Sequence, residues 1–194
     1  MHSRTSLRRL IEGNERFVSG AADPVDLVEL RKANASGQSP WAAVVACSDS
    51  RVAPEIVFDT TIGDLFVVRT AGNVVDELVL ASLRFGVHAL GAPLIVVLGH
   101  YGCGAVQATC DGDTPESLAC VCDEVRPSVE VARARAASEK VILCDEAVRR
   151  HAEAMADRVR SDAELGDAVP VLWGVYDVAS GEVSFQEIDV LDTP

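Results

Sequence analysis

The sequence predicts an α/β protein with a mainly parallel central β-sheet, an antiparallel edge strand, flanking helices and an N-terminal helical arm. Short apolar runs, of the kind buried in parallel sheets, alternate with longer stretches of helical periodicity. Near the C-terminus, the turn-forming sequence Ala179-Ser180-Gly181 precedes a last short strand-like run, which indicates a hairpin. This order of elements is typical of a sheet with helices on its faces.

The N-terminal segment is expected to form the helical arm. Five apolar residues in it recur at near-helical spacing: Leu7, Leu10, Ile11, Phe17 and Val18. Asp23 and Pro24 then look like an N-cap followed by a proline at the first helical position, which predicts a second short helix ending near Lys32. We therefore expect one domain over residues 1–194, with the arm at 1–35 and the α/β core at 36–194.

The core is predicted to alternate strands with helices. Four apolar runs are the expected parallel strands: residues 41–46, 65–70, 93–99 and 169–178. The helix between the second and third strands is expected from about residue 74 to residue 89, with Asn73 as its N-cap. A charged helical region over residues 115–160 precedes the last parallel strand, and residues 183–188 form the predicted edge strand.

Length and charge limit the functions that this chain can have. With 194 residues and 48% hydrophobic content, it is long enough for one well-buried domain and short for two. A net charge of −13 argues against binding nucleic acid or an anionic membrane surface, because both need clustered positive charge. The apolar stretch at 78–99 is interrupted by charged residues, glycine and proline, which argues against a transmembrane helix. No apolar signal segment follows the first arginines, so we expect a cytoplasmic protein.

Two of the predicted strands run directly into polar clusters. The first strand is followed by CSDSR at 47–51, and the third ends in HYGCG at 100–104. If these parallel strands are neighbours in register, their carboxyl ends bring Cys47, His100 and Cys103 together. Two thiolates and an imidazole are a good ligand set for a tetrahedral zinc ion. The sequence therefore predicts a zinc site at this edge of the sheet.

Three protein ligands leave a fourth position open, which is typical of a catalytic zinc rather than a structural one. Asp49 and Arg51 alternate along the same segment, so both side chains face one side if the segment is extended. An arginine beside a carboxylate fixes its orientation and lowers its pKa. Taken alone, a strand-end cysteine is more often core and such a pair is often an ordinary ion pair. The joint occurrence of both motifs favours the metal site.

On these motifs the sequence resembles the β-class carbonic anhydrases. The resemblance rests on CSDSR and HYGCG, is supported by GDLFVVRTAGN at 63–73, and covers most of the chain. It implies that Cys47, His100 and Cys103 hold one zinc ion (Zn2+) per subunit and that Asp49 and Arg51 form a catalytic dyad. It also implies a lyase (carbonate dehydratase) that reversibly hydrates carbon dioxide to bicarbonate and a proton through a zinc-bound hydroxide.

The resemblance extends to a substrate pocket and to a partner. GQSP at 37–40 is similar to the plant-type branch of the family, in which this glutamine, here Gln38, reaches the substrate from a dimer interface. Phe66 and Phe85 stand where that branch places aromatic pocket walls, and the Gly104 backbone N–H is a candidate donor to the developing bicarbonate. The implied assembly is a homodimer or a higher homo-oligomer with active sites at the interface.

Two other readings remain open at this stage. A hydrolase for carbon disulfide or carbonyl sulfide on the same scaffold would use the same ligands, and pocket access would decide between the substrates. A non-catalytic zinc or redox module would leave Asp49 and Arg51 without a role. The four other cysteines are expected to fill the core as small apolar side chains: Cys110, Cys120, Cys122 and Cys144.

Overall fold

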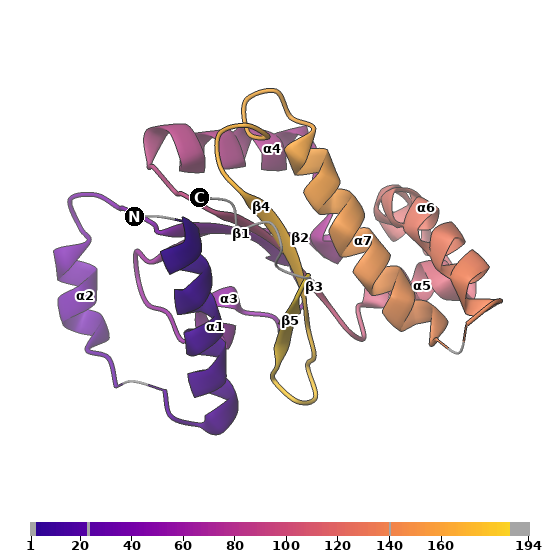
Figure 1. The fold of residues 1–194 in the computed structure, drawn as a ribbon, viewed down its shortest axis with the longest axis horizontal. Coiled ribbons are helices and arrows are strands. Elements are labelled where there is room, and N and C mark those ends of the chain that lie inside the picture. The colour runs from indigo at the N-terminus through magenta and orange to yellow at the C-terminus, as the bar shows by residue number, and fades with distance from the viewer. Residues whose placement is uncertain (1–2, 23, 140, 187–194) are drawn as a thin grey trace.

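A five-stranded sheet in the order β2-β1-β3-β4-β5 runs through the middle of the molecule (Figure 1). The computed structural model describes residues 3–22, 24–139 and 141–186. Within them the strands are β1 (Ala42–Cys47), β2 (Leu65–Thr70), β3 (Ile95–His100), β4 (Val171–Tyr176) and β5 (Val183–Phe185). Strands β2, β1, β3 and β4 pair in parallel, whereas β5 pairs antiparallel with β4. The predicted fold class is confirmed.

Helices and short helical turns connect the strands. In chain order they are α1 (Ser3–Ser19), α2 (Leu27–Ala33), α3 (Pro54–Val57), the 3₁₀ turn η1 (Ala71–Asn73), α4 (Glu77–Arg84), the π-helical turn η2 (Phe85–Ala89), α5 (Gly104–Asp111), the 3₁₀ turn η3 (Glu116–Leu118), α6 (Ala119–Ala136) and α7 (Leu143–Arg160). No helix in the described part of the chain is long and apolar enough to cross a membrane.

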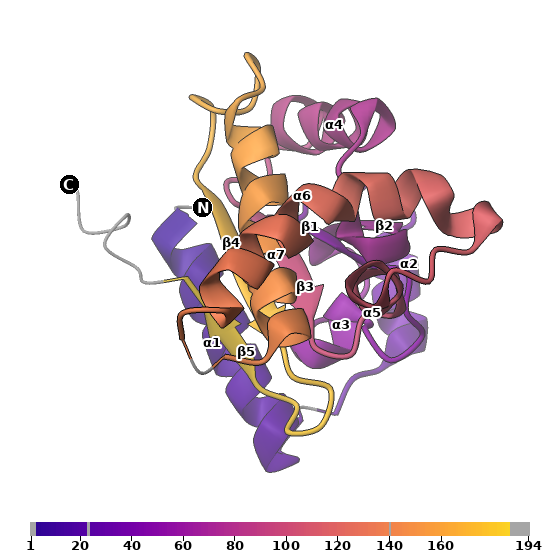
Figure 2. The same cartoon turned by 90° about the vertical axis from the view of Figure 1, so that its right-hand side faces the viewer.

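The strand residues alternate between two apolar layers. Ala43, Val45 and Val97 pack with α4 and α7 on one face of the sheet. On the other face, Val44 and Val96 pack with α1 and α3. Figures 1 and 2 show the sheet between these two sets of helices. Strands β1 and β3 are fully buried, which explains why they read as continuous apolar runs.

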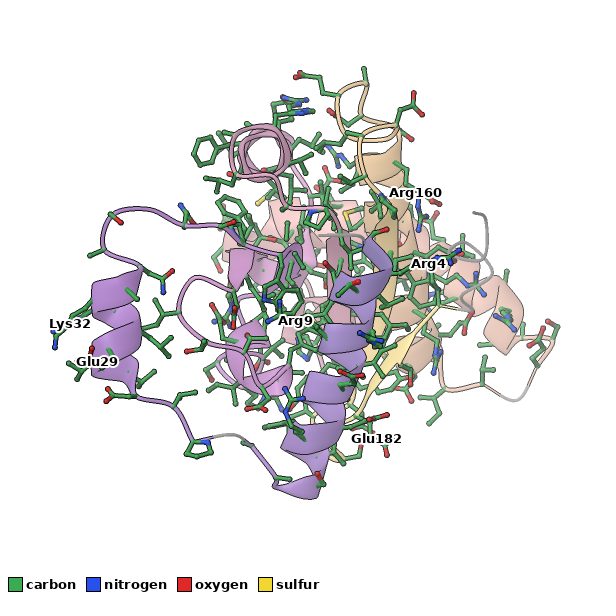
Figure 3. All side chains as sticks on the ribbon, turned by 60° about the vertical axis from the view of Figure 1, so that its left-hand side comes forward. Arg4, Arg9, Glu29, Lys32, Arg160 and Glu182 are labelled. Atoms are coloured by element: carbon green, nitrogen blue, oxygen red, sulfur yellow. The ribbon has the colours of Figure 1, made fainter. Side chains whose placement is uncertain are left out.

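The two helices of the N-terminal segment differ in how they contact the rest of the chain. Helix α1 buries Leu7 and Leu10 against the sheet, and Asn14 donates to the carbonyl oxygens of Val57 (3.0 Å) and Gly181 (2.8 Å). Helix α2 buries no residue, and Figure 3 shows its Glu29 and Lys32 far out from the sheet. The segment predicted as one arm therefore consists of a docked helix and an exposed one.

Two predicted helix starts are wrong by three residues. The second helix begins after Asp26, whose side chain accepts from two backbone N–H groups, and Pro24 lies before it, while Asp23 lies outside the described residues. Helix α4 is capped by Asp76, not by Asn73, because Asn73 has a left-handed φ of 47° and closes η1. In both cases a nearer aspartate competes for the cap. The edge strand ends at Phe185, one residue before Gln186, and residues 187–188 of the prediction lie outside the described residues.

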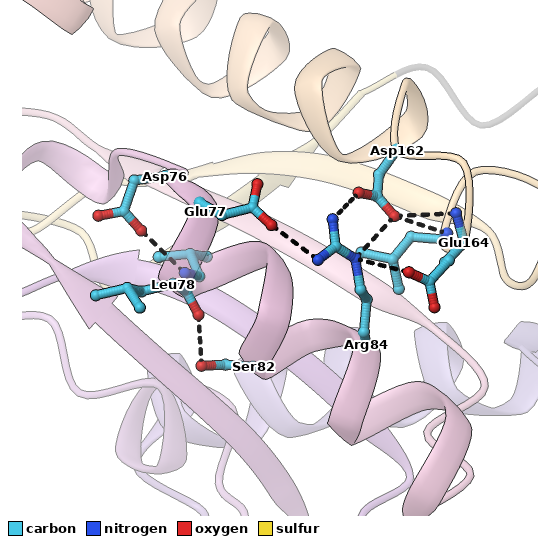
Figure 4. A network of polar contacts seen from close by, with 9 residues as sticks. Asp76, Glu77, Leu78, Ser82, Arg84, Asp162 and Glu164 are labelled. Carbon is cyan, nitrogen blue, oxygen red and sulfur yellow. Dashed lines mark hydrogen bonds and ion pairs between the residues drawn. The ribbon is translucent and has the colours of Figure 1, made fainter.

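A charged contact fastens α4 to the turn that follows α7. Arg84 lies 2.5 Å from the Asp162 carboxylate and 2.9 Å from that of Glu77, and Glu164 lies nearby (Figure 4). The Arg84 guanidinium holds the pKa of Asp162 below its usual range. This network ties together the two helices that cover one face of the sheet.

Candidate metal centre

Cys47, His100 and Cys103 converge at the carboxyl end of the parallel sheet. Cys47 is the last residue of β1 and His100 the last of β3, and these strands pair in parallel with Ala46 opposite Leu98. The turn after β3 then returns Cys103 to the same place, with Gly102 at a left-handed φ of 69°. One ligand atom from each of the three residues lies within 4.8 Å of the others, and all three residues are buried.

The imidazole of His100 is oriented for metal binding. Its Nδ1 lies 3.0 Å from the Tyr101 carbonyl oxygen. A carbonyl only accepts, so Nδ1 carries the proton and Nε2 keeps its lone pair. Nε2 is buried and has no hydrogen-bond partner in the described part of the chain. A metal ion in this group would satisfy that nitrogen, and a carbonyl on the other ring nitrogen is the usual support for a histidine ligand.

The pKa values of the two thiols of the group are shifted in opposite directions. The pKa of Cys47 is lowered, chiefly because the Cys103 side chain donates to its sulphur. The pKa of Cys103 is raised, first by its bond to Cys47 and then by burial, while the N–H groups of Ala105 and Val106 favour its thiolate. Two adjacent sulphurs that resist a joint negative charge suit a divalent cation, which binds both as thiolates. Together with the His100 nitrogen, the donor set fits zinc.

Asp49 lies beside this group, paired with Arg51. The Arg51 backbone N–H and Nε both donate to Oδ1 at 2.9 Å, and a terminal nitrogen donates to Oδ2 at 2.7 Å. These bonds hold the pKa of Asp49 well below its usual range. Both lone pairs of Oδ1 accept hydrogen bonds from Arg51, whereas Oδ2 keeps one lone pair that can accept a hydrogen bond from another group. Arg51 also donates to the Gly102 carbonyl at 3.2 Å, which joins the two motifs.

From the sequence, Arg69 is expected to act as a local positive charge near the candidate metal centre, and in the structure its side chain binds the backbone of the first motif. Its Nε donates to the Cys47 carbonyl at 2.9 Å and its terminal nitrogen to the Asp49 carbonyl at 2.6 Å. Arg69 lies in β2, opposite Ala46 of β1, so its side chain reaches along the neighbouring strand. The sequence feature that indicates this role is the position of Arg69, one residue before the end of β2, the strand that pairs with β1.

The four predicted pocket residues do not all lie at the ligand group. Gly104 does, because it is the first residue of α5 and directly follows Cys103. Phe66 pairs with Ala43, four residues before Cys47, which places it about 13 Å along the strand from the ligand end. Phe85 contacts Phe66, with ring centroids 6.2 Å apart. Gln38 lies exposed in the loop before β1.

The remaining cysteines are only in part the core residues that we expected. Cys110 and Cys122 are buried, and Cys144 is half-buried against the same cluster. Cys120 is exposed near the start of α6, so its predicted burial is wrong. The reason is the helix geometry, because Cys122 occupies the inward face and a residue two positions away points elsewhere.

Comparisons with known proteins agree with this arrangement. A family model described as carbonic anhydrase matches residues 42–183. Carbonic anhydrase 2 of Mycobacterium tuberculosis is 49% identical over 132 residues, which are 65% of this chain and 64% of that relative's length. A carbonic anhydrase of Pseudomonas aeruginosa is 35% identical over 209 residues, covering 96% of this chain and 88% of that protein.

The solved structures show the same fold. The β-carbonic anhydrase of Coccomyxa superposes with a TM-score of 0.71 at 26% identity, covering 92% of this chain and 85% of that one. The region that the family model matches contains both motifs, the strands β1 to β4 and the first residue of β5. The chain belongs to the carbonic anhydrase family, and to its β class.

Proposed function

We propose that this protein is a zinc-dependent enzyme that reversibly hydrates carbon dioxide to bicarbonate and a proton. The observation that carries the proposal is the buried group of Cys47, His100 and Cys103, with an unpartnered imidazole nitrogen, directly beside a paired aspartate. When bound, zinc lowers the pKa of a coordinated water so that hydroxide is available near neutral pH. Cys47, His100 and Cys103 would hold the ion with three protein ligands, which would leave room for a water as the fourth.

The chain's own residues have separate roles in this reaction. Asp49, kept ionised by Arg51, accepts a hydrogen bond at the free lone pair of Oδ2 and so orients the attacking oxygen. The Gly104 N–H lies in the first turn of α5, where backbone donors have no partner within the helix. It is therefore suited to bind the negative charge that develops on a carbon dioxide oxygen.

The direct test compares two cysteine variants of the purified protein. Cys47→Ala removes one ligand, whereas Cys120→Ala removes an exposed thiol outside the ligand group. We expect one zinc ion per chain and rapid hydration in the wild type and in Cys120→Ala. Cys47→Ala should lose both zinc, measured by atomic emission, and hydration, measured by stopped-flow pH indicator. Hydration retained in Cys47→Ala would falsify the zinc mechanism.

We further propose that the active protein is a homodimer or a larger homo-oligomer that contains this dimer. Strand β2 is apolar but only half-buried and lies at the edge of the sheet. Exposed apolar side chains cluster next to it in the fold, with Ile62 at 43%, Phe85 at 52% and Leu78 at 77% exposure. An apolar sheet edge of this kind is covered in most native proteins. A second copy would also bring Gln38, Phe66 and Phe85 toward the ligand group of its partner.

A complementation experiment tests this sharing of sites. One variant carries Asp49→Asn, and the other carries Gln38→Ala with Phe85→Ala, both at exposed positions. If the pocket residues act across the interface, a mixed dimer contains one fully intact site, so co-expression restores hydration above both parents. If they act within their own chain, each site of the mixed dimer has a defect. No gain over the parents would then refute the shared site.

The thiols support a cytoplasmic location as part of this proposal. All six cysteines are free in the structure, and zinc binding requires Cys47 and Cys103 as reduced thiolates. A reducing compartment keeps them in that state.

A further inference from the structure

His151 is a buried histidine that the proposed reaction does not use. It lies on the inner face of α7 and is only 1% exposed. Its Nε2 lies 2.8 Å from the Gly72 carbonyl oxygen in η1, and its Nδ1 faces the Ser128 hydroxyl of α6 at 3.5 Å. Burial lowers the pKa of His151, so the ring is neutral. Because the carbonyl only accepts, the single proton is on Nε2, which donates to Gly72.

Gly72 is held in a conformation that favours glycine. Its φ of 63° and ψ of 22° are left-handed, and a Cβ there would meet Ala105 at 3.2 Å and Val121 at 3.3 Å. Helices α5 and α6 thus pack against one side of this residue. From another side, the hydrogen bond that His151 of α7 donates to the Gly72 carbonyl fixes the orientation of the Gly72–Asn73 peptide.

The same turn reaches the ligand group. Thr70, at the end of β2, pairs with Cys47, so η1 begins next to the end of β1. The Asp49 N–H donates to the Cys47 sulphur at 3.4 Å, and the Gly72 N–H lies on the side of η1 that faces this sulphur and makes a smaller contribution than Cys103 to lowering the pKa of that thiol. Gly72 therefore stands between His151 and Cys47, because its carbonyl accepts from His151 at 2.8 Å and its N–H faces the Cys47 sulphur.

We propose that His151 is a positioning residue of the metal centre, which holds the Gly72 turn so that its backbone N–H is directed at the Cys47 sulphur. The inference rests on the proposed role of Cys47 as a zinc ligand. N–H donors to a ligating thiolate fix its direction and tune the charge that it gives to the metal. His151 acts on the metal through this peptide and has no contact with substrate.

Two substitutions separate the hydrogen bond from simple packing. In His151→Gln the amide nitrogen stands close to the Nε2 position and can still donate to Gly72. In His151→Asn the side chain is one methylene shorter, so its amide nitrogen falls near the Nδ1 position and cannot reach. Both variants keep a neutral polar group in the cavity. His88→Asn is the matched control, because His88 also contacts a backbone carbonyl, that of Glu164 at 3.0 Å, in another part of the fold.

The first readout is zinc affinity, measured on the full-length protein by competition with a chromophoric chelator. We expect His151→Asn to bind zinc about 10- to 100-fold more weakly than the wild type. His151→Gln and His88→Asn should stay within about threefold of it. The second readout is the thiolate-to-cobalt absorption band of the cobalt-substituted protein, which reports the sulphur ligands directly. It should shift in His151→Asn and recover in His151→Gln.

The possible outcomes separate this inference from the proposed function. Equal zinc affinity and equal cobalt spectra in all variants would overturn the positioning role while leaving the zinc site intact. Equal weakening in His151→Gln and His151→Asn would overturn it too, because packing rather than the donated bond would then be responsible. A wild-type protein that binds neither zinc nor cobalt would instead refute the proposed function.

Discussion

Arg51 binds both carboxylate oxygens of Asp49, with its Nε 2.9 Å from Oδ1 and a terminal nitrogen 2.7 Å from Oδ2. One residue separates Asp49 from Arg51 in the chain, and the backbone N–H of Arg51 also donates to Oδ1. This fork leaves Asp49 ionised with one acceptor site free. The geometry needs a planar guanidinium, because an ammonium group cannot donate to both oxygens in the same fixed way.

Replacing Arg51 by lysine should therefore keep the charge and lose the orientation. We expect Arg51→Lys to retain its zinc and to hydrate carbon dioxide about 10²-fold more slowly, as is typical when a reacting group is misplaced. Stopped-flow rates, normalised to zinc content, measure the effect. Arg31→Lys, on the exposed helix α2, is the control and should be unchanged. A wild-type rate in Arg51→Lys would show that the fork does not orient Asp49.

Arg69 should be needed for the stability of the same segment. Its guanidinium donates to the carbonyl oxygens of Cys47 and Asp49, and removing the side chain loses both charged hydrogen bonds, although the Asp49 carbonyl still accepts from the Val52 N–H at 3.0 Å. Arg69→Met, which keeps most of the length, should lower the free energy of unfolding by about 1–3 kcal/mol. Urea denaturation of the zinc-loaded protein measures this change. If Arg69→Met is as stable as the exposed control Arg31→Met, the hydrogen bonds from Arg69 to the two carbonyl oxygens do not stabilise the protein.

Gly13 marks the place where α1 docks most closely. A Cβ at this position would lie 1.9 Å from the Phe58 carbonyl oxygen, so the helix would have to move away from the core. We expect Gly13→Ala to destabilise the protein by about 1–3 kcal/mol despite the better helix propensity of alanine. Gly37→Ala, where a Cβ meets nothing within 4 Å, should change stability by less than about 0.5 kcal/mol. If Gly13→Ala and Gly37→Ala have the same midpoint of unfolding in urea, the contact between Gly13 and Phe58 is not a tight one.

The Arg84–Asp162 contact should make stability depend on pH in a defined direction. The pKa of Asp162 is lowered in the folded protein, chiefly by its bond to Arg84. Its contribution is therefore complete above the ordinary aspartate pKa of about 4 and is lost as the pH falls through the lower, folded value. Asp162→Asn keeps the size and should lower the melting temperature by about 2–4 °C at pH 7.

The pH dependence of that difference is the sharper test. Calorimetry of both proteins should show a constant gap in melting temperature between wild type and Asp162→Asn from pH 7 down to about 4, and a narrowing gap below about pH 4, where the Asp162 carboxylate of the unfolded wild type takes up a proton. Effects of acid on the metal centre are common to both proteins and cancel in the difference. A gap that also stays constant below about pH 4 would mean that Asp162 acts by shape and not by charge.

Local patterns in the chain were enough to predict the sheet and the ligands. The apolar runs at β1 and β3 are recognisable because both strands are buried on both faces, so they lack polar residues. The polar motifs follow directly where these runs end, and parallel pairing requires strand ends to meet at one edge. For this reason the local sequence alone predicts that Cys47, His100 and Cys103 lie together, as they do in the structure.

Contacts between segments distant in the chain could not be predicted in this way. Arg69 reaches the carbonyls of β1 from a neighbouring strand, and His151 reaches Gly72 from a helix 79 residues away. Arg69 stands within the GDLFVVRTAGN segment and His151 lies outside all the quoted motifs, but the role of each depends on which backbone groups the packing places beside it. The side chains that follow the strand ends can therefore be predicted from the local sequence. The hydrogen bonds that hold those side chains in place depend on how helices and strands pack in three dimensions.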